Sequence, residues 1–131
     1  YFAILSRTES ISAITNLLDN SIYWVSRSKS EGRMIYIYIT DSFINGYVTI
    51  AVCDNGPGFK MDPSLAVRPF VTGKPLDSGM GLGLYIASET LSQMGGKLLI
   101  INENEIELPD LAKDKGINKA IVTLSFPKAK L

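Results

Sequence analysis

The strongest constraint on the fold is an amphipathic segment near the beginning of the chain, residues 6–27. Its apolar side chains recur at the spacing of one face of an α-helix, which predicts a helix with a single apolar stripe. Ser6, with Glu9 three residues later, fits a capping box at the start of this helix. The stripe consists of Ile11, Ile14, Leu17, Leu18, Ile22 and Val25. A helix of this kind needs a second layer of secondary structure to cover its apolar side.

Two β-forming segments supply the beginning of that layer. Residues 33–40 are rich in isoleucine and tyrosine, and residues 47–53 form a second apolar run. Asn45-Gly46 between them is a turn signal, so the two segments are predicted to pair as a hairpin.

The second half of the chain contains both kinds of element again. We expect a helix over residues 82–94, ended by Gly95-Gly96, and strands over residues 97–101 and 120–126. Two helices and about four strands with hairpin connections predict an α+β fold. The expected architecture is a two-layer α/β sandwich with a mixed or antiparallel sheet covered by helices on one face. The polar residues 102–118 are interpreted as a surface insertion.

Composition narrows the class of protein. The 131 residues suit one domain spanning residues 1–131, and 13 basic residues balance 13 acidic ones, which gives no indication of nucleic acid binding. No apolar run approaches the roughly 18 residues needed to span a bilayer.

The sequence contains no histidine, the commonest general base. The single cysteine, Cys53, lies in an apolar run and is predicted to be a buried thiol in a reducing compartment. Because the first residue is Tyr1 rather than Met, we interpret the chain as a fragment of a larger protein.

Two asparagines stand out in the first predicted helix. Asn16 and Asn20 are four positions apart, so a helix places them on one face, one turn from each other. Asparagine is unfavourable in the middle of a helix because its amide competes with the backbone. The pair is either part of a solvated polar face or a place where a carboxamide oxygen coordinates a hard cation such as Mg²⁺.

The run Asp54-Asn55-Gly56-Pro57-Gly58-Phe59 directly follows the second predicted strand. It is either a plain turn or a ligand site. In a ligand site, the carboxylate would accept a hydrogen bond from an exocyclic amine such as that of adenine, and the glycines would let the ligand approach the backbone. Residues 55–79 form a long connection with one expected helical turn near residues 63–67, and connections of this length are usually functional or disordered.

Three alternate glycines, Gly79, Gly81 and Gly83, open the second predicted helix. They weaken a helix, but they suit a helix start whose N–H groups face a phosphate. Neither the G-x-G-x-x-G pattern nor the P-loop pattern matches this segment. Upstream, Lys74 either meets a terminal phosphate or is solvated, and Phe70 is either a hydrophobic anchor or a ligand contact.

Taken in order, these segments resemble the ATP-binding catalytic domain of sensor histidine kinases. That domain shares a superfamily with the Hsp90 chaperone, the type II topoisomerase ATPase and MutL. Residues 16–21 resemble the asparagine box and residues 54–59 the first glycine box. Pro69-Phe70 resembles the phenylalanine box and residues 79–84 the second glycine box. The four boxes cover most of the chain, and the resemblance implies the Bergerat-type ATP-binding fold.

The resemblance implies a role for each matching residue. Asn20 would bind Mg²⁺, with Asn16 as a supporting polar contact, and Asp54 would accept a hydrogen bond from the adenine amino group. Lys74 would reach the terminal phosphate from a lid over residues 61–80, which makes Asn16, Asn20 and Lys74 the expected catalytic residues. The family often has a basic residue where this chain has Tyr23. The other implied ATP contacts are Tyr23, Trp24, Gly56, Gly58, Phe59, Phe70, Thr72, Gly73, Gly79, Met80, Gly81, Leu82, Gly83 and Leu84.

The resemblance also implies a reaction. ATP-hydrolysing relatives have a glutamate one turn before the magnesium asparagine, whereas this chain has Asn16, which cannot act as a base. The implied enzyme is therefore a protein histidine kinase of a two-component system, which donates the γ-phosphate of ATP to a histidine on an upstream dimerisation domain. The implied partners are that domain and the receiver domain of a response regulator, and the fragment itself is expected to be monomeric and cytoplasmic. The alternative is a nucleotide-gated conformational module, in which ATP binding or slow hydrolysis occurs without histidine phosphotransfer.

Overall fold

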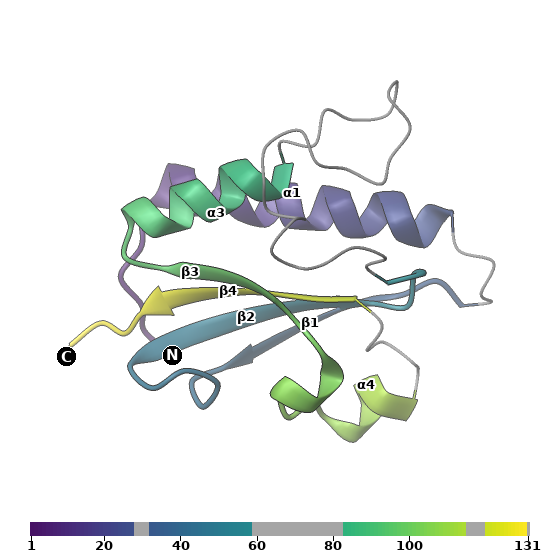
Figure 1. The fold of residues 1–131 in the computed structure, drawn as a ribbon. Helices are drawn as coiled ribbons and strands as arrows, with labels where there is room; N and C mark the ends of the chain where they lie inside the picture. The colour runs from purple at the N-terminus through teal and green to yellow at the C-terminus, as the bar shows by residue number, and fades with distance from the viewer. Residues whose placement is uncertain (28–31, 59–82, 115–119, 131) are drawn as a thin grey trace.

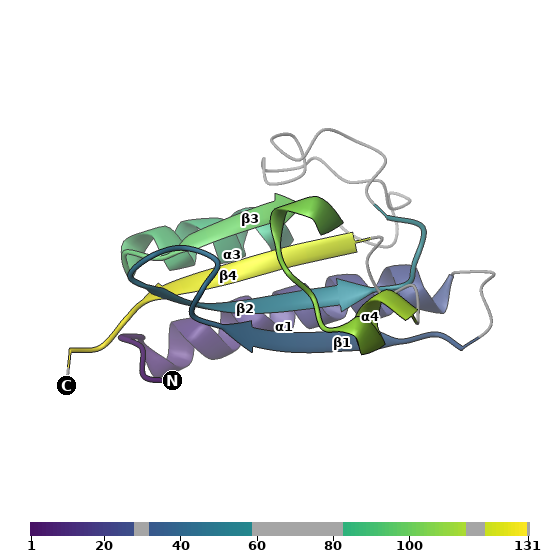
Figure 2. The same ribbon diagram turned by 90° about the horizontal axis from the view of Figure 1, so that it is seen from below.

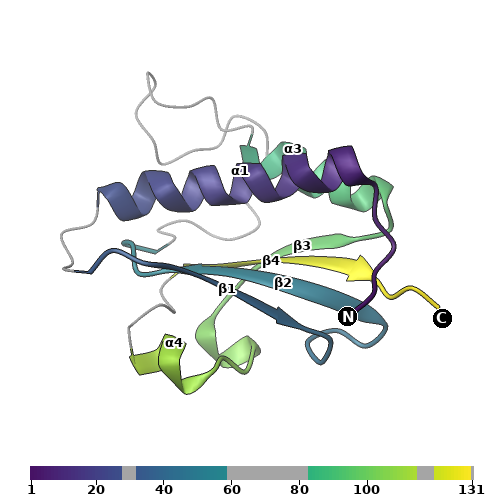
Figure 3. The ribbon, with the colours of Figure 1, turned by 180° about the vertical axis from the view of Figure 1, so that it is seen from behind.

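The computed structural model describes residues 1–27, 32–58, 83–114 and 120–130, which form two layers (Figure 1). One layer is a four-stranded antiparallel sheet with the strand order β1-β2-β4-β3. Its strands are β1 (Ile35–Thr40), β2 (Tyr47–Asp54), β3 (Lys97–Ile101) and β4 (Ala120–Pro127). The other layer contains α1 (Arg7–Ser26) and α3 (Gly83–Gln93), which lie side by side on one face of the sheet (Figures 1 and 3). The predicted α+β sandwich is confirmed, and the sheet is antiparallel throughout the described residues.

The register of β2 determines where the sheet ends. β1 and β2 form the predicted hairpin, with Ile35 opposite Asp54. On its other side β2 pairs with β4, from Tyr47 opposite Pro127 to Asp54 opposite Ala120. Asp54 is therefore the last residue of a central strand, at the end of the sheet where β1 and β4 begin.

The buried face of α1 differs from the predicted stripe. Leu17 belongs to a core cluster with Val52 of β2 and Leu124 of β4. Ile11 and Ile22, however, are 56% and 52% exposed, so their place in the stripe was wrong. They are eleven positions apart, about three helical turns, and so point in the same direction, away from the sheet. The buried residues of α1 are Ser10, Ala13, Leu17, Ser21 and Val25, whose small members let the helix lie close to its neighbours.

The start of α1 and the end of α3 lie next to each other and are formed differently. Ser6 is the N-cap of α1, but its side chain makes no capping hydrogen bond to the helix backbone, so the predicted capping box was wrong. The Ser6 hydroxyl instead donates to the Glu9 carboxylate, and the Ser6 N–H donates to Met94 Sδ at 3.3 Å. At the end of α3 the glycine pair acts as predicted. Gly95 has a φ of 74°, and the Gly96 N–H donates to the Leu91 carbonyl at 2.8 Å.

The opposite face of the sheet is partly covered by the insertion between β3 and β4. This insertion contains η1 (Glu103–Glu105) and α4 (Asp110–Asp114), which lie on the side of the sheet away from α1 and α3 (Figures 1 and 2). Ile106 and Leu108 are buried in a second cluster with Cys53 of β2. Burial, with a smaller contribution from the Asp54 charge, raises the pKa of the Cys53 thiol to about 12. The predicted buried thiol is confirmed, and the insertion is more than a surface loop.

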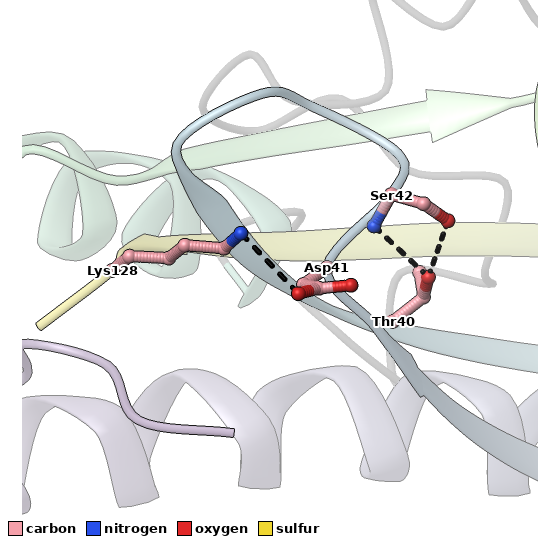
Figure 4. Close-up of polar contacts among 4 residues, drawn as sticks. All are labelled: Thr40, Asp41, Ser42 and Lys128. Carbon is pink, nitrogen blue, oxygen red and sulfur yellow. Dashed lines mark hydrogen bonds and ion pairs between the residues drawn. The ribbon is translucent and has the colours of Figure 1, made fainter.

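A short pairing joins the beginning of the described chain to the segment after β4. Ala3 and Lys128 form an antiparallel bridge, the Ile4 N–H donates to the Pro127 carbonyl at 2.8 Å, and the Ala129 N–H donates to the Phe2 carbonyl at 3.0 Å. Nearby, Lys128 Nζ lies 3.3 Å from Asp41 Oδ2 in the β1–β2 connection (Figure 4). Figure 4 also shows the Thr40 hydroxyl bonded to both the backbone N–H and the hydroxyl of Ser42. Both members of the ion pair are about half exposed, so it contributes little to stability.

No helix in the described ranges is long and apolar enough to cross a lipid bilayer.

The two faces of α1 give a direct test of this packing. We expect Leu17→Ala to lower the free energy of unfolding by about 2–5 kcal/mol, because Leu17 is fully buried and its truncation leaves a cavity. Ile11→Ala on the same helix is the matched control and should change stability by no more than about 0.5 kcal/mol. Urea denaturation followed by circular dichroism measures both. Equal losses for the two variants would contradict the orientation of α1.

Candidate functional site

The second half of α1 presents a polar stripe beside its buried face. Asn16, Asn20 and Tyr23 follow one another at intervals of four and three residues and are all partly buried. Arg27 continues the stripe one turn later, with its guanidinium 3.6 Å from the centre of the Tyr23 ring and a hydrogen bond to the Tyr23 carbonyl. The Tyr23 ring meets Trp24 edge to face, with 5.0 Å between centroids. The C-terminal end of α1 therefore combines amide oxygens, aromatic rings and a cation.

Asp54 is a nearly buried carboxyl group at the end of β2. Only 3% of the residue is exposed, and its Oδ1 accepts a hydrogen bond of 2.9 Å from the Gly56 N–H. Burial raises the pKa of Asp54 above its usual range, while hydrogen bonds from the Gly56 amide and the Ser21 side chain act in the opposite direction. Two donors thus partly compensate the carboxylate for its lost hydration.

The two glycines after Asp54 fit their positions for different reasons. A Cβ on Gly56 would lie 2.9 Å from Asp54 Oδ1 and 3.4 Å from the backbone carbon of Trp24. The segment therefore passes directly under α1, and a side chain at this position would push on both neighbours. Gly58 has a φ of 79°, a conformation that glycine adopts without strain. Figure 1 shows this segment turning back beneath the C-terminal half of α1.

Asn55 fixes the same segment to the start of β1. Its Oδ1 accepts from the Met34 N–H at 2.9 Å, and its Nδ2 donates to the Gly32 carbonyl at 2.8 Å. The backbone N–H of Asn55 donates to the Met34 carbonyl at 3.3 Å. Asn55 is only 7% exposed. Its side chain therefore joins the segment after β2 to the segment before β1, at the edge of the site.

The structure brings several of the predicted site residues together and leaves others outside its description. Asp54 and Gly56 lie close to Trp24, which belongs to α1, the helix that also carries Asn16 and Asn20. Gly83 opens α3 with free space where a Cβ would lie, and Leu84 packs against the core. The predicted residues that lie outside the described ranges are Phe59, Phe70, Thr72, Gly73, Lys74, Gly79, Met80, Gly81 and Leu82, together with the helical turn expected near residues 63–67.

The donor set on α1 fits a hard cation only in combination with a ligand. Within residues 1–27, 32–58, 83–114 and 120–130, no three histidine, cysteine, aspartate or glutamate side chains gather in a way that would hold a metal ion. Asn16 and Asn20 offer neutral carboxamide oxygens on one helical face. Mg²⁺ accepts such oxygens and retains waters and substrate phosphates as its other ligands. The residues present therefore fit Mg²⁺ carried with a nucleotide.

Three residues of this region, Ser21, Asn55 and Arg27, are not among the predicted site residues. Ser21 stands beside Ile22 of the predicted apolar stripe, although a serine on a buried helical face indicates that a polar partner is near. Asn55 belongs to a glycine-rich turn. Arg27 is the last residue of the predicted helix, and its spacing of four from Tyr23 places it over that ring.

A sequence model of the family described as "Histidine kinase-, DNA gyrase B-, and HSP90-like ATPase" matches residues 8–130. The chain is 37% identical, over 91 residues, to the C4-dicarboxylate transport sensor protein DctB of Pseudomonas aeruginosa, a match that covers 69% of this chain and 14% of that protein. It is 33% identical, over 100 residues, to histidine protein kinase SaeS of Staphylococcus epidermidis, which covers 71% of this chain and 27% of that protein. The chain thus spans a minor part of the length of these relatives.

Solved structures show the same fold. The mycobacterial sensor histidine kinase MprB matches with a TM-score of 0.71 and 21% identity, covering 98% of this chain and 76% of that one. The catalytic domain of histidine kinase ThkA matches with a TM-score of 0.66 and 23% identity, covering 94% and 68%. The two-layer arrangement of α1, α3 and the sheet is therefore shared with these domains.

The two hydrogen bonds of the Asn55 side chain should contribute measurably to the free energy of unfolding. We expect Asn55→Ala to cost about 2 kcal/mol, because it removes two side-chain hydrogen bonds at a nearly buried position. Asn104→Ala, at an exposed position in η1, is the control and should change stability by less than about 0.5 kcal/mol. Thermal and urea unfolding of both variants test this. If Asn55→Ala left the free energy of unfolding unchanged, these hydrogen bonds would not stabilise the fold.

The burial of Asp54 predicts a pH dependence with a definite sign. Because its pKa is raised in the folded state, the folded chain holds the proton more tightly than the unfolded chain does. The contribution of Asp54 to stability therefore falls as the pH rises from the usual aspartate range, at about pH 4, through the raised pKa. Asp54→Asn removes this contribution, so its stability relative to wild type should increase over the same interval. Denaturation at a series of pH values checks the sign, and a difference that decreases with pH would contradict it.

Proposed function

The chain belongs to the histidine kinase-, DNA gyrase B- and HSP90-like ATPase family, and from this membership we propose that it binds Mg²⁺–ATP and donates the γ-phosphate to a histidine on another domain. In this proposal residues 1–131 are the catalytic, ATP-binding domain of a two-component sensor kinase. Its relatives DctB and SaeS are a sensor protein and a histidine protein kinase.

The observation that supports this proposal most directly is the buried carboxylate of Asp54. A carboxylate with two internal donors still has acceptor positions free, because its two oxygens offer about four lone-pair sites. An exocyclic amine is a suitable partner for such an acceptor in a site that excludes water. Adenine carries that amine at its 6-position, and the lack of a side chain at Gly56 lets the turn pack closely against Asp54 and Trp24.

The phosphates and the metal are assigned to the other predicted residues. Asn20 supplies an oxygen to Mg²⁺ with Asn16 beside it, and Mg²⁺ when bound neutralises charge on the phosphates. Gly83, the first residue of α3, and Gly79 and Gly81, which precede it in the sequence, would present backbone N–H groups to the phosphates. Lys74 contributes a positive charge to the terminal phosphate.

The same side chains favour transfer to a distant histidine over hydrolysis. The sequence has no histidine, and Asn16 cannot take a proton from water. In the proposed reaction the bond between the γ-phosphorus and the bridging oxygen breaks as a phosphorus–nitrogen bond to the histidine forms, and ADP leaves. The chain's own contribution is to position ATP and to stabilise charge.

Because the accepting histidine is not in this sequence, the proposed reaction requires partner domains. The accepting histidine belongs to a dimerisation domain of the same protein, and a receiver domain of a response regulator takes the phosphate from it. The domain itself is expected to be monomeric and to work in the cytoplasm, where ATP is available.

Calorimetry with Mg²⁺–ATP tests the proposed pocket. We expect Asn20→Ala to abolish magnesium-dependent binding and Asp54→Asn to weaken ATP binding about tenfold or more, because each removes a contact that only the nucleotide complex satisfies. Asp41→Asn is the matched control, since Asp41 is an acid at the opposite end of the sheet, paired with Lys128. Unchanged affinity in both pocket variants would refute this site.

Phosphotransfer needs a separate assay. The parent protein, or this chain mixed with its histidine-containing domain, should form an acid-labile phosphohistidine from γ-labelled ATP. ATP binding without any such product would favour the nucleotide-gated conformational module instead.

A further inference from the structure

The polar stripe on α1 ends in a cation that is held in a defined place. Arg27 is the C-cap of α1, and its backbone, with φ of −100° and ψ of −1°, stays on the helical path. Its Nη1 donates to the Tyr23 carbonyl at 3.2 Å, and the guanidinium carbon lies 3.6 Å from the centre of the Tyr23 ring. An exposed arginine loses much rotamer freedom in such an arrangement, so the two contacts fix the position of the charge.

This position points the charge back along the helix toward the two asparagines. At about 100° per residue, Asn16, Asn20, Tyr23 and Arg27 all lie within about 60° of one another around the axis. Side chains on a helix lean toward its N-terminus, and Arg27 accordingly covers the turn that contains Tyr23. Tyr23 is only three positions after Asn20, a rise of about 4.5 Å. The guanidinium is therefore brought to within about one helical turn of Asn20.

The guanidinium keeps most of its hydrogen-bonding capacity in this position. It has five N–H donors, and in the described part of the chain its acceptor is the Tyr23 carbonyl. Within residues 1–27, 32–58, 83–114 and 120–130, no carboxylate forms an ion pair with it. A cation at the end of a helix also interacts favourably with the helix dipole. That interaction explains a basic residue at position 27, but it does not require the guanidinium to lie over a ring on the polar stripe.

A phosphate is the ligand that best matches this group. Asn16 and Asn20 are neutral and bring no positive charge to an anion, whereas Arg27 does. The planar guanidinium donates two parallel hydrogen bonds to a pair of phosphate oxygens, and one face of it remains available for an aromatic ring. Here Tyr23 occupies that face.

We propose that Arg27 binds the polyphosphate of the nucleotide beside Asn20, and that the Tyr23 ring is the support that positions its guanidinium. The inference rests on the proposed function, since it takes the ligand to be a nucleotide with its phosphates near Asn20. Arg27 donates to phosphate oxygens through N–H groups that the Tyr23 carbonyl does not use. Tyr23 is then a positioning residue, which acts on the phosphates through Arg27.

The test compares Arg27→Gln with Arg7→Gln, which is the same substitution at the first residue of the same helix and makes the same change in net charge. In titration calorimetry, Arg27→Gln should weaken Mg²⁺–ATP binding about tenfold and leave adenosine binding unchanged, because adenosine has no phosphates. Arg7→Gln should leave both affinities unchanged. Equal losses for ATP and adenosine in Arg27→Gln would assign Arg27 only to the structure of the helix end, and unchanged ATP affinity would likewise overturn the proposal.

Two further readouts separate a charge contact from a packing role. The difference in ATP affinity between wild type and Arg27→Gln should shrink as salt is raised from about 0.05 M to about 0.5 M, because an exposed ion pair is screened. Arg27→Lys keeps the charge without the planar fork, so its ATP affinity should fall between those of wild type and Arg27→Gln. A difference that ignores salt, or a lysine variant as weak as the glutamine variant, would contradict the assigned contact.

A double-mutant cycle tests the role of the ring. Tyr23→Leu removes the aromatic face, and in this background Arg27→Gln should reduce ATP affinity less than it does in wild type, since the guanidinium is no longer positioned. Fully additive effects would overturn the positioning role of Tyr23. Wild-type binding of Mg²⁺–ATP that Arg27→Gln does not weaken overturns this inference alone, whereas failure of the wild-type chain to bind Mg²⁺–ATP overturns the proposed function.

Discussion

The organisation of this domain depends on keeping one carboxylate at the junction of the sheet and α1, almost out of contact with water. A buried aspartate is unfavourable unless donors surround it, and here they come from the turn that follows β2 and from the helix above. The position of α1 relative to Asp54 depends on the distance at which the helix packs against the sheet. The core contact of Leu17 with β2 and β4 sets that distance. Packing and the proposed recognition of the nucleotide therefore depend on the same helix.

Different elements cover the two faces of the sheet near the end of β2. On one face, α1 lies over the end of β2, with the Trp24 backbone close to Gly56. On the other, Ile106 and Leu108 of the insertion close over Cys53, the residue before Asp54. Since successive residues of a strand point to opposite faces, the two neighbours are buried from opposite sides. The end of β2 is therefore packed on both faces, although Asp54 is the last residue of its strand.

The sequence was sufficient for the elements whose periodicity is strong. β3 begins and ends where it was predicted, and the hairpin of β1 and β2 follows from two runs of β-forming residues on either side of Asn45-Gly46. It was insufficient where tertiary packing chooses among similar residues. Helical spacing alone could not show that Ile22 faces outward while Ser21 faces the core, because adjacent positions differ by only about 100° around the axis. Asp54 was recognisable from its motif, but the bonds that Asn55 makes to Met34 and Gly32 depend on residues distant in sequence.

The short pairing between residues 2–4 and 127–129 has a mechanical consequence. It lies at the end of the sheet where β2 begins, whereas Asp54 lies at the end where β2 finishes. Tension applied between Phe2 and Ala129 would load the hydrogen bonds of this pairing first and would reach neither the C-terminal half of α1 nor the turn after β2 until they broke. The region around Asp54 is thus insulated from strain in the flanking backbone.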